Sequence, residues 1–135
     1  MSRFTIYFSK IVKIGFPLMI GVLCVFVGPV LAHAATRTWD GGGTGNSWST
    51  KENWSEDTAP TSSDLVVFDG TSTKAATLDS SFAGSVAGIS INSGYTGTIN
   101  QNRILTVGTG GFSQASGTFN GGTYNIILNG DFTLS

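Results

Sequence analysis

Any chemistry in this 135-residue chain would have to come mainly from carboxylates, a few cations and three tryptophans. The only cysteine, Cys24, and the only histidine, His33, both lie before Ala34. The rest of the chain therefore lacks the residues for a disulfide, a thiolate nucleophile, a serine–histidine relay or a zinc site with histidine or cysteine ligands. We expect no cofactor, no metal site and no catalytic residues.

The charged residues after residue 34 are few and mostly acidic. Eight Asp and Glu stand there against four Lys and Arg, a net charge of 4 − 8 = −4. Because a phosphate backbone attracts cationic surfaces, nucleic-acid binding is not expected. Six of the acids could in principle bind calcium, but their spacing matches neither the EF-hand loop nor the Gly-Gly-x-Gly-x-Asp repeat. We interpret them as a solvated acidic face: Asp40, Glu52, Glu56, Asp57, Asp64 and Asp69.

Charge is nearly absent from residues 75–135, which hold only Asp79, Arg103 and Asp131. Acid–base catalysis needs paired titratable groups with displaced pKa values. Folding could bring Arg103 near Asp79, so the N-terminal part of a glycan-active enzyme stays open as an alternative. We favour a non-enzymatic protein whose neutral, hydroxyl-rich surface suits contact with polysaccharide or with a host or neighbouring cell.

Three tryptophans fall close together in the sequence: Trp39, Trp48 and Trp54. One interpretation is a carbohydrate-binding module, because flat indoles stack on sugar rings. The other is a lid that covers the exposed core of a β-structure at its first layer. We favour the lid, built by Trp48 and Trp54 together with Leu65, Val67 and Phe68 of a strand predicted at residues 65–68. Residues 37–40 form a second strand in this prediction, and residues 49–53 a helical turn with Ser49 as its N-cap and Glu52 completing a capping box.

The stretch from residue 86 to residue 135 reads as short β-strands joined by Gly, Asn, Ser and Thr corners. Two passages nearly superimpose, because Phe132 repeats Phe112 and Leu128 repeats Val107 at almost the same spacing. The period is near 20, which is typical of stacked repeats, with one extra residue in the first copy's corner. The predicted strands lie at residues 88–92, 95–99, 104–107, 117–120 and 124–128.

Alternate residues of these strands are apolar, and period-two alternation places them on one side. A single repeat buries too few side chains to offset the entropy of ordering, so each must stack on its neighbours. The predicted inward set is Ile89, Ile91, Ile104, Leu105, Val107, Ile126, Leu128, Phe132 and Leu134. Four asparagines are expected at corners, where they can form ladders between turns: Asn92, Asn100, Asn120 and Asn129. The sequence therefore predicts an all-β parallel solenoid.

The segment that ends at Ala34 has the parts of a secretory signal peptide. Arg3, Lys10 and Lys13 precede an apolar run over residues 14–31, and small residues follow at Ala32 and Ala34. We expect a hydrophobic signal helix, cleavage between Ala34 and Ala35, and export through a bacterial inner membrane to the cell surface or medium. The alternative is a retained membrane anchor, since about 18 apolar residues can just span a bilayer.

One pattern resembles a known family. It runs Trp39-x-Gly, then Trp48-Ser-x-x-x-Asn53-Trp54, then Pro60-x-x-x-Asp64-x-Val66-x-Phe68. It is similar to the opening unit of bacterial autotransporter-like, β-strand-repeat surface proteins, and residues 94–99 and 117–122 resemble the repeats that follow there. The resemblance implies an exported, adhesin-like or structural passenger with a right-handed β-helix, and it carries no catalytic residues.

The expected organisation is a signal peptide at 1–34, a tryptophan-rich cap at 35–74 and solenoid repeats at 75–135. The sequence stops at Leu134-Ser135, within a predicted strand. Such an edge is open to further pairing. We therefore expect either a fragment of a longer protein or an edge covered by a partner copy, and we favour the fragment.

Overall fold

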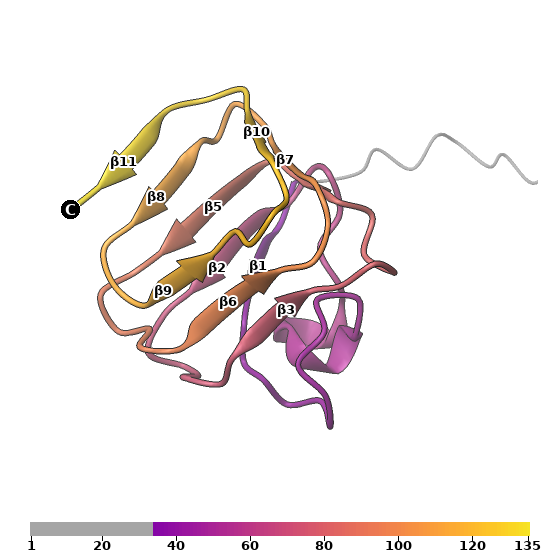
Figure 1. The fold of residues 1–135 in the computed structure, drawn as a ribbon. Coiled ribbons are helices and arrows are strands. Elements are labelled where there is room, and N and C mark those ends of the chain that lie inside the picture. The colour runs from indigo at the N-terminus through magenta and orange to yellow at the C-terminus, as the bar shows by residue number, and fades with distance from the viewer. Residues whose placement is uncertain (1–33) are drawn as a thin grey trace, which may run out of the picture. The chain divides into compact units, whose positions relative to one another are not determined.

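The structure, a computed structural model, describes residues 34–135, and the predicted signal helix lies outside them. The described residues form short parallel strands in three sheets (Figure 1). The sheet orders are β1-β2-β5-β8-β11, β3-β6-β9 and β4-β7-β10. The strands are β1 (Thr36–Thr38), β2 (Leu65–Phe68), β3 (Ala76–Leu78), β4 (Ser85–Val86), β5 (Gly88–Ile91), β6 (Thr98–Gln101), β7 (Leu105–Val107), β8 (Phe112–Gln114), β9 (Thr118–Asn120), β10 (Ile126–Leu128) and β11 (Phe132–Leu134).

Three consecutive strands make one turn, and each turn gives one strand to each sheet. The turns are β2-β3-β4, β5-β6-β7 and β8-β9-β10, with β1 before them and β11 after them. Every strand pair is parallel, as a coil requires. The prediction of an all-β parallel solenoid is therefore confirmed. The stacking includes β1 and β2, so it starts within the segment 35–74.

The predicted repeat alignment is also confirmed. Phe132 pairs with Phe112, and Leu128 pairs with Val107. The extra residue of the earlier copy lies in the corner between β7 and β8. Gly111 in that corner has φ of +72°, and a Cβ there would lie 2.6 Å from the carbonyl oxygen of Asp131 in the next turn. The close approach of two successive corners thus requires glycine.

The turns stack into a column, and inside it the apolar side chains of successive turns lie one above another. Val66, Ile89 and Phe112 are in register in the longest sheet. Phe68 of β2 is buried, as predicted, but the prediction for Leu65 and Val67 was wrong: Leu65 is 37% exposed and Val67 is half-buried, whereas Val66 is buried. Alternate residues of a strand face opposite sides, and the pairing with β5 places Val66 and Phe68 on the inner side. Ile104 was also assigned inward, but it precedes β7 and is 52% exposed.

The strand predicted at residues 95–99 begins later, at Thr98. Tyr95 lies in the corner before it and is fully buried, with its ring centroid 5.0 Å from that of Phe68. The asparagine prediction holds only in part. Asn100 and Asn120 lie within β6 and β9 rather than at corners, and the Asn120 amide donates to Asn100 Oδ1 at 3.2 Å. The ladder between turns exists, but its members are strand residues.

The only helices of residues 34–135 are two short 3₁₀ turns, η1 (Lys51–Asn53) and η2 (Ser55–Asp57). The predicted capping box is wrong. Thr50 precedes η1 and makes no side-chain cap, while Ser49 donates its hydroxyl and amide to Asp79 at 2.8 and 3.0 Å. A carboxylate from the loop after β3 therefore takes the bonds that a cap would have used.

Candidate functional site

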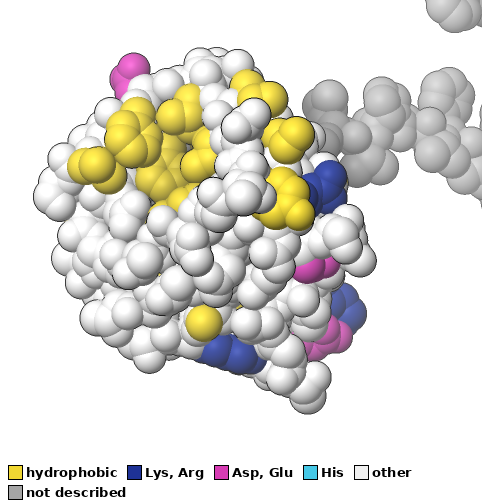
Figure 2. All heavy atoms as spheres, in the orientation of Figure 1, with side chains coloured by type: hydrophobic (Ala, Val, Ile, Leu, Met, Phe, Trp, Pro, Cys, Tyr) yellow, Lys and Arg dark blue, Asp and Glu magenta, His cyan; other side chains and the backbone are white. Residues whose placement is uncertain are grey.

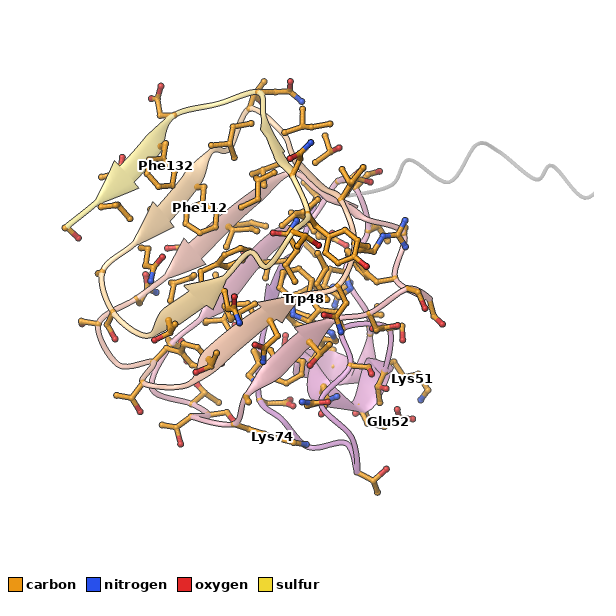
Figure 3. All side chains as sticks on the ribbon, in the orientation of Figure 1. Trp48, Lys51, Glu52, Lys74, Phe112 and Phe132 are labelled. Atoms are coloured by element: carbon orange, nitrogen blue, oxygen red, sulfur yellow. The ribbon has the colours of Figure 1, made fainter. Side chains whose placement is uncertain are left out.

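The three tryptophans form one cluster around Phe68. The ring centroids of Trp39, Trp48 and Trp54 lie 5.7, 5.6 and 5.8 Å from that of Phe68. Trp54 meets the other two edge to face at 5.1 and 5.3 Å. These are favourable arrangements for aromatic pairs. Figure 3 shows Trp48 within the column, near its N-terminal end.

All three tryptophans have an exposed fraction of 0%. A sugar-binding indole needs one face open to solvent, and none of these residues offers one. The indole nitrogen of Trp39 donates to the carbonyl of Lys74 at 3.0 Å, and that of Trp54 to the carbonyl of Trp48 at 2.8 Å. The indole nitrogen of Trp48 is buried and has no partner among residues 34–135. The cluster is thus part of the core.

The backbone around the cluster covers the outer edges of two sheets. Trp39 and Trp54 form an antiparallel bridge beside β1, where the amide of Asp40 donates to the carbonyl of Asn53 at 3.0 Å. Ser47 forms a parallel bridge with Thr77 of β3. At these bridges, backbone groups that an open sheet edge would expose are paired.

Lys74 fastens the glycine loop, residues 41–46, to this end. Its ammonium donates to the carbonyls of Gly41 and Gly43 at 2.9 and 2.5 Å and to Asn53 Oδ1 at 3.2 Å. Its own carbonyl accepts from Trp39 and from the Tyr95 hydroxyl, the latter at 3.0 Å. An ammonium with three acceptors has no donor left for catalysis, so Lys74 serves structure. Burial raises the pKa of Tyr95 to about 12.

Two carboxylates are built into loops. Burial alone would raise the pKa of Asp64, but the hydrogen bonds from Ala35 and Thr61 and the charge of Arg37 outweigh it, so its pKa lies below the usual value. The pKa of Asp79 is likewise lowered, because donors from Ser49 and Ser81 outweigh its burial. Asp64 is 3% exposed and so does not belong to a solvated acidic face as predicted.

The other acids of the predicted face lie apart. Glu56 pairs with Arg37 at 2.7 Å, and Glu52 pairs with Lys51 at 3.1 Å on the surface (Figure 3). Asp40 and Asp69 accept backbone amides two residues ahead, at 3.0 and 2.8 Å. Residues 34–135 contain no group of three His, Cys, Asp or Glu side chains close enough to hold a metal ion.

Arg103 does not pair with Asp79 in the structure. Its guanidinium donates instead to the carbonyl of Ser80 at 3.0 Å, on the loop of the turn below. This contact joins Arg103 to the residue that follows Asp79 and ties two neighbouring turns together. The pair is therefore not arranged for proton transfer.

The C-terminal end of the column is open. Phe132 and Leu134 of β11 are 56% and 64% exposed, and Phe132 stacks on Phe112 of the turn below with ring centroids 5.5 Å apart. Figure 2 shows hydrophobic side chains gathered at this end, with most charged side chains far from it. Within the described residues, each of β9, β10 and β11 is paired on one side only.

Sequence reasoning missed two anchoring residues, Lys74 and Asp64. A signal existed for both, since each is a charged residue placed one or two positions before an apolar strand in a chain with few charges. Their partners lie 21 to 33 positions away along the chain for Lys74 and 29 positions away for the Ala35 amide. Spacing alone does not indicate such contacts.

Comparison of the chain with protein-family models, with curated proteins and with solved structures finds no match. None of the helices in residues 34–135 has the length and apolar character needed to cross a membrane.

Proposed function

We propose that this chain is an exported, non-enzymatic surface protein, adhesin-like or structural, similar to autotransporter-like passengers. The observation that carries the proposal is the regular outer surface of the solenoid. Outward side chains repeat in register from turn to turn: the hydroxyls of Ser90 and Ser113 are 3.2 Å apart, and Asn120 donates to Asn100. Thr98 pairs in register with Thr118 beside that second ladder. A surface of this kind offers many weak hydrogen bonds and little charge.

The charged residues support the same proposal by where they are used. Arg37 pairs with Glu56, Lys74 holds the glycine loop and Asp79 holds Ser49, all in or against the segment 35–57. The charge in these three contacts thus stabilises one end of the fold. The lid interpretation of the tryptophans belongs to this proposal: the aromatic cluster closes the end from which the turns are stacked. We expect a right-handed coil, because parallel crossovers within one sheet are nearly always right-handed.

The partner that fits such a surface is a neutral polysaccharide or the glycan coat of a host or neighbouring cell. Hydroxyl and amide side chains exchange hydrogen bonds with sugar hydroxyls without the desolvation of charge. Thr98 and Asn100 of β6 lie in register with Thr118 and Asn120 of β9 and form a regular grid on this surface.

The test follows the full chain, carrying a C-terminal epitope tag, in a bacterial host. We expect the tag in the envelope or the medium, sensitive to added protease in intact cells, and a mature N-terminus at Ala35. Retention in the cytoplasm with the predicted signal peptide still attached would contradict export. In a pull-down with insoluble polysaccharides, Asn100→Lys with Asn120→Lys should weaken binding, whereas Thr106→Lys on another sheet should not. Equal binding of both variants would contradict the proposed surface.

A further inference from the structure

The backbone of Ala35 is fixed at both ends by the start of β2. Its amide nitrogen donates to Asp64 Oδ1 at 2.9 Å, and its carbonyl oxygen accepts from the amide of Leu65 at 2.8 Å. These two bonds join residues that are 29 and 30 positions apart. The first residue of the proposed mature chain is therefore held at a defined position.

Asp64 is a buried carboxylate, and one of its two oxygens already accepts two hydrogen bonds. Its Oδ2 accepts from the Thr61 amide and hydroxyl, both at 2.8 Å. Its Oδ1 accepts only from the Ala35 amide among the described contacts. Among the described residues, the cation that faces Asp64 is Arg37, whose Nε lies 4.0 Å from Oδ2 and whose Nη1 binds Glu56 at 2.7 Å. A buried negative charge is costly unless a cation faces it closely, so Oδ1 is suited to a positively charged donor.

We propose that Asp64 is a receptor for the α-ammonium group that cleavage between Ala34 and Ala35 creates. The inference rests on the proposed export of the chain. A signal peptidase adds water across the peptide bond: the carbonyl carbon of Ala34 gains the hydroxyl, the nitrogen of Ala35 gains the hydrogen, and a proton taken up from solvent completes the ammonium. The nitrogen already lies 2.9 Å from Oδ1, so cleavage turns an amide hydrogen bond into a charge-assisted pair without moving the backbone.

The surroundings have room for the new group. A hollow of about 350 Å³ is lined by Ala34, Ala35, Ser63, Leu65 and neighbouring residues. Water in that hollow can accept the two N–H bonds of the ammonium that do not face Asp64. The charged groups near the ammonium among the described residues are Asp64 before β2, Arg37 on β1 and, through Arg37, Glu56 in η2.

The pairing predicts a dependence on pH that an amide does not have. The α-amino group has a pKa of about 8 in an unfolded chain, and the facing carboxylate raises this pKa in the folded state. A raised pKa of a basic group gives stability that is complete below the unfolded value and is lost as the pH rises through the folded value. The mature protein should therefore lose stability above about pH 8 through this group.

The experiment compares two exported, cleaved forms of the full chain. In the variant, Gly-Ser is inserted between Ala34 and Ala35, so cleavage after Ala34 leaves two extra residues and moves the ammonium away from Asp64. N-terminal sequencing confirms each cut. We expect the insertion to lower the folding equilibrium constant about tenfold at pH 6.5 and much less at pH 10.5. In an Asp64→Asn background the insertion should have little effect, and in an Asp69→Asn background, the matched control, it should keep its full effect.

Each outcome decides the inference. An insertion without effect, an equal effect in the Asp64→Asn background, or an equal effect at the two pH values would overturn it. So would a cut at another bond of an exported chain, which leaves the proposed export intact. A chain that stays uncut in the cytoplasm contradicts the proposed function, and the receptor inference falls with it. If Asp64→Asn does not fold, the pH comparison carries the test.

Discussion

The two ends of this column are built from similar residues and differ in what covers them. At the N-terminal end, three tryptophans surround Phe68 with no exposed surface, and bridges at Trp39 and Ser47 pair the outer edges of two sheets. At the C-terminal end, Phe132 stacks on Phe112 in the same sheet but remains 56% exposed. A phenylalanine in a parallel stack is stabilised fully only when side chains cover both of its faces. In the proposed lid, the segment 35–57 supplies that cover at one end.

The largest expected effect tests this difference directly. Phe68→Ala should lower the free energy of unfolding by about 3–5 kcal/mol, because it leaves a cavity among four aromatic rings. Phe132→Ala should cost less than about 1 kcal/mol, because much of that ring already contacts water. Urea unfolding of both variants measures the two losses of unfolding free energy. Similar losses would show that packing stabilises the two ends equally, which would contradict the difference described above.

The next effect concerns the cation that holds the closed end. Lys74→Met should cost about 2–3 kcal/mol, because it leaves the carbonyls of Gly41 and Gly43 and the Asn53 amide oxygen without their charged donor. Lys51→Met removes an exposed lysine paired only with Glu52 and should leave the urea midpoint almost unchanged, because water screens such a surface pair. Urea midpoints are compared for both variants. If Lys51→Met shifts the midpoint as much as Lys74→Met, the loop is not held by its lysine.

Acid should weaken the closed end first. The pKa values of Asp64 and Asp79 are lowered in the folded state, so each adds stability above about pH 4 that is lost as the pH falls through the folded value. Asp64→Asn should cost about 2 kcal/mol at pH 7 and flatten the fall of stability with decreasing pH below about pH 4. Asp131→Asn, at the open end, should cost less than about 0.5 kcal/mol at pH 7.

If the free energy of unfolding of Asp64→Asn falls with decreasing pH as steeply as that of the wild type, the acid sensitivity comes from other groups. Asp79→Asn then offers a separate check at the second loop, since its contacts with Ser49 and Ser81 are independent of Ala35 and Thr61.

The smallest effect tests the link between the cluster and the second turn. Tyr95→Phe keeps the ring beside Phe68 and removes the hydroxyl that donates to the Lys74 carbonyl, at a cost of about 1 kcal/mol. The raised pKa of Tyr95, about 12, means that the unfolded chain releases this proton before the folded one. The free energy of unfolding should therefore fall between about pH 10 and pH 12 through this group, and the wild-type profile there should fall more steeply than that of Tyr95→Phe, which lacks the ionisable hydroxyl. Identical alkaline profiles would place Tyr95 outside the cluster.

Much of the fold could be predicted from local pattern. The spacing of Val107 and Phe112 against Leu128 and Phe132 predicted the register of two turns to the residue, since similar corners must stack. The inward face of β2 could not be predicted, because Leu65-Val-Val-Phe68 is apolar at every position and only pairing with β5 selects Val66 and Phe68. Ser49 failed as a helix cap for a similar reason: a distant carboxylate competes for its hydroxyl.

By itself, the sequence determined the all-β parallel solenoid, its period and the poverty of charge after residue 75. These depend on contacts between residues about one turn apart, which repeated spacing makes visible. Only the tertiary structure decided that the tryptophans are buried around Phe68, that Lys74 holds the glycine loop, and that Asp64 meets the backbone of Ala35. Each of those contacts joins unlike residues that are far apart along the chain, and no repeat in the sequence records such a pairing.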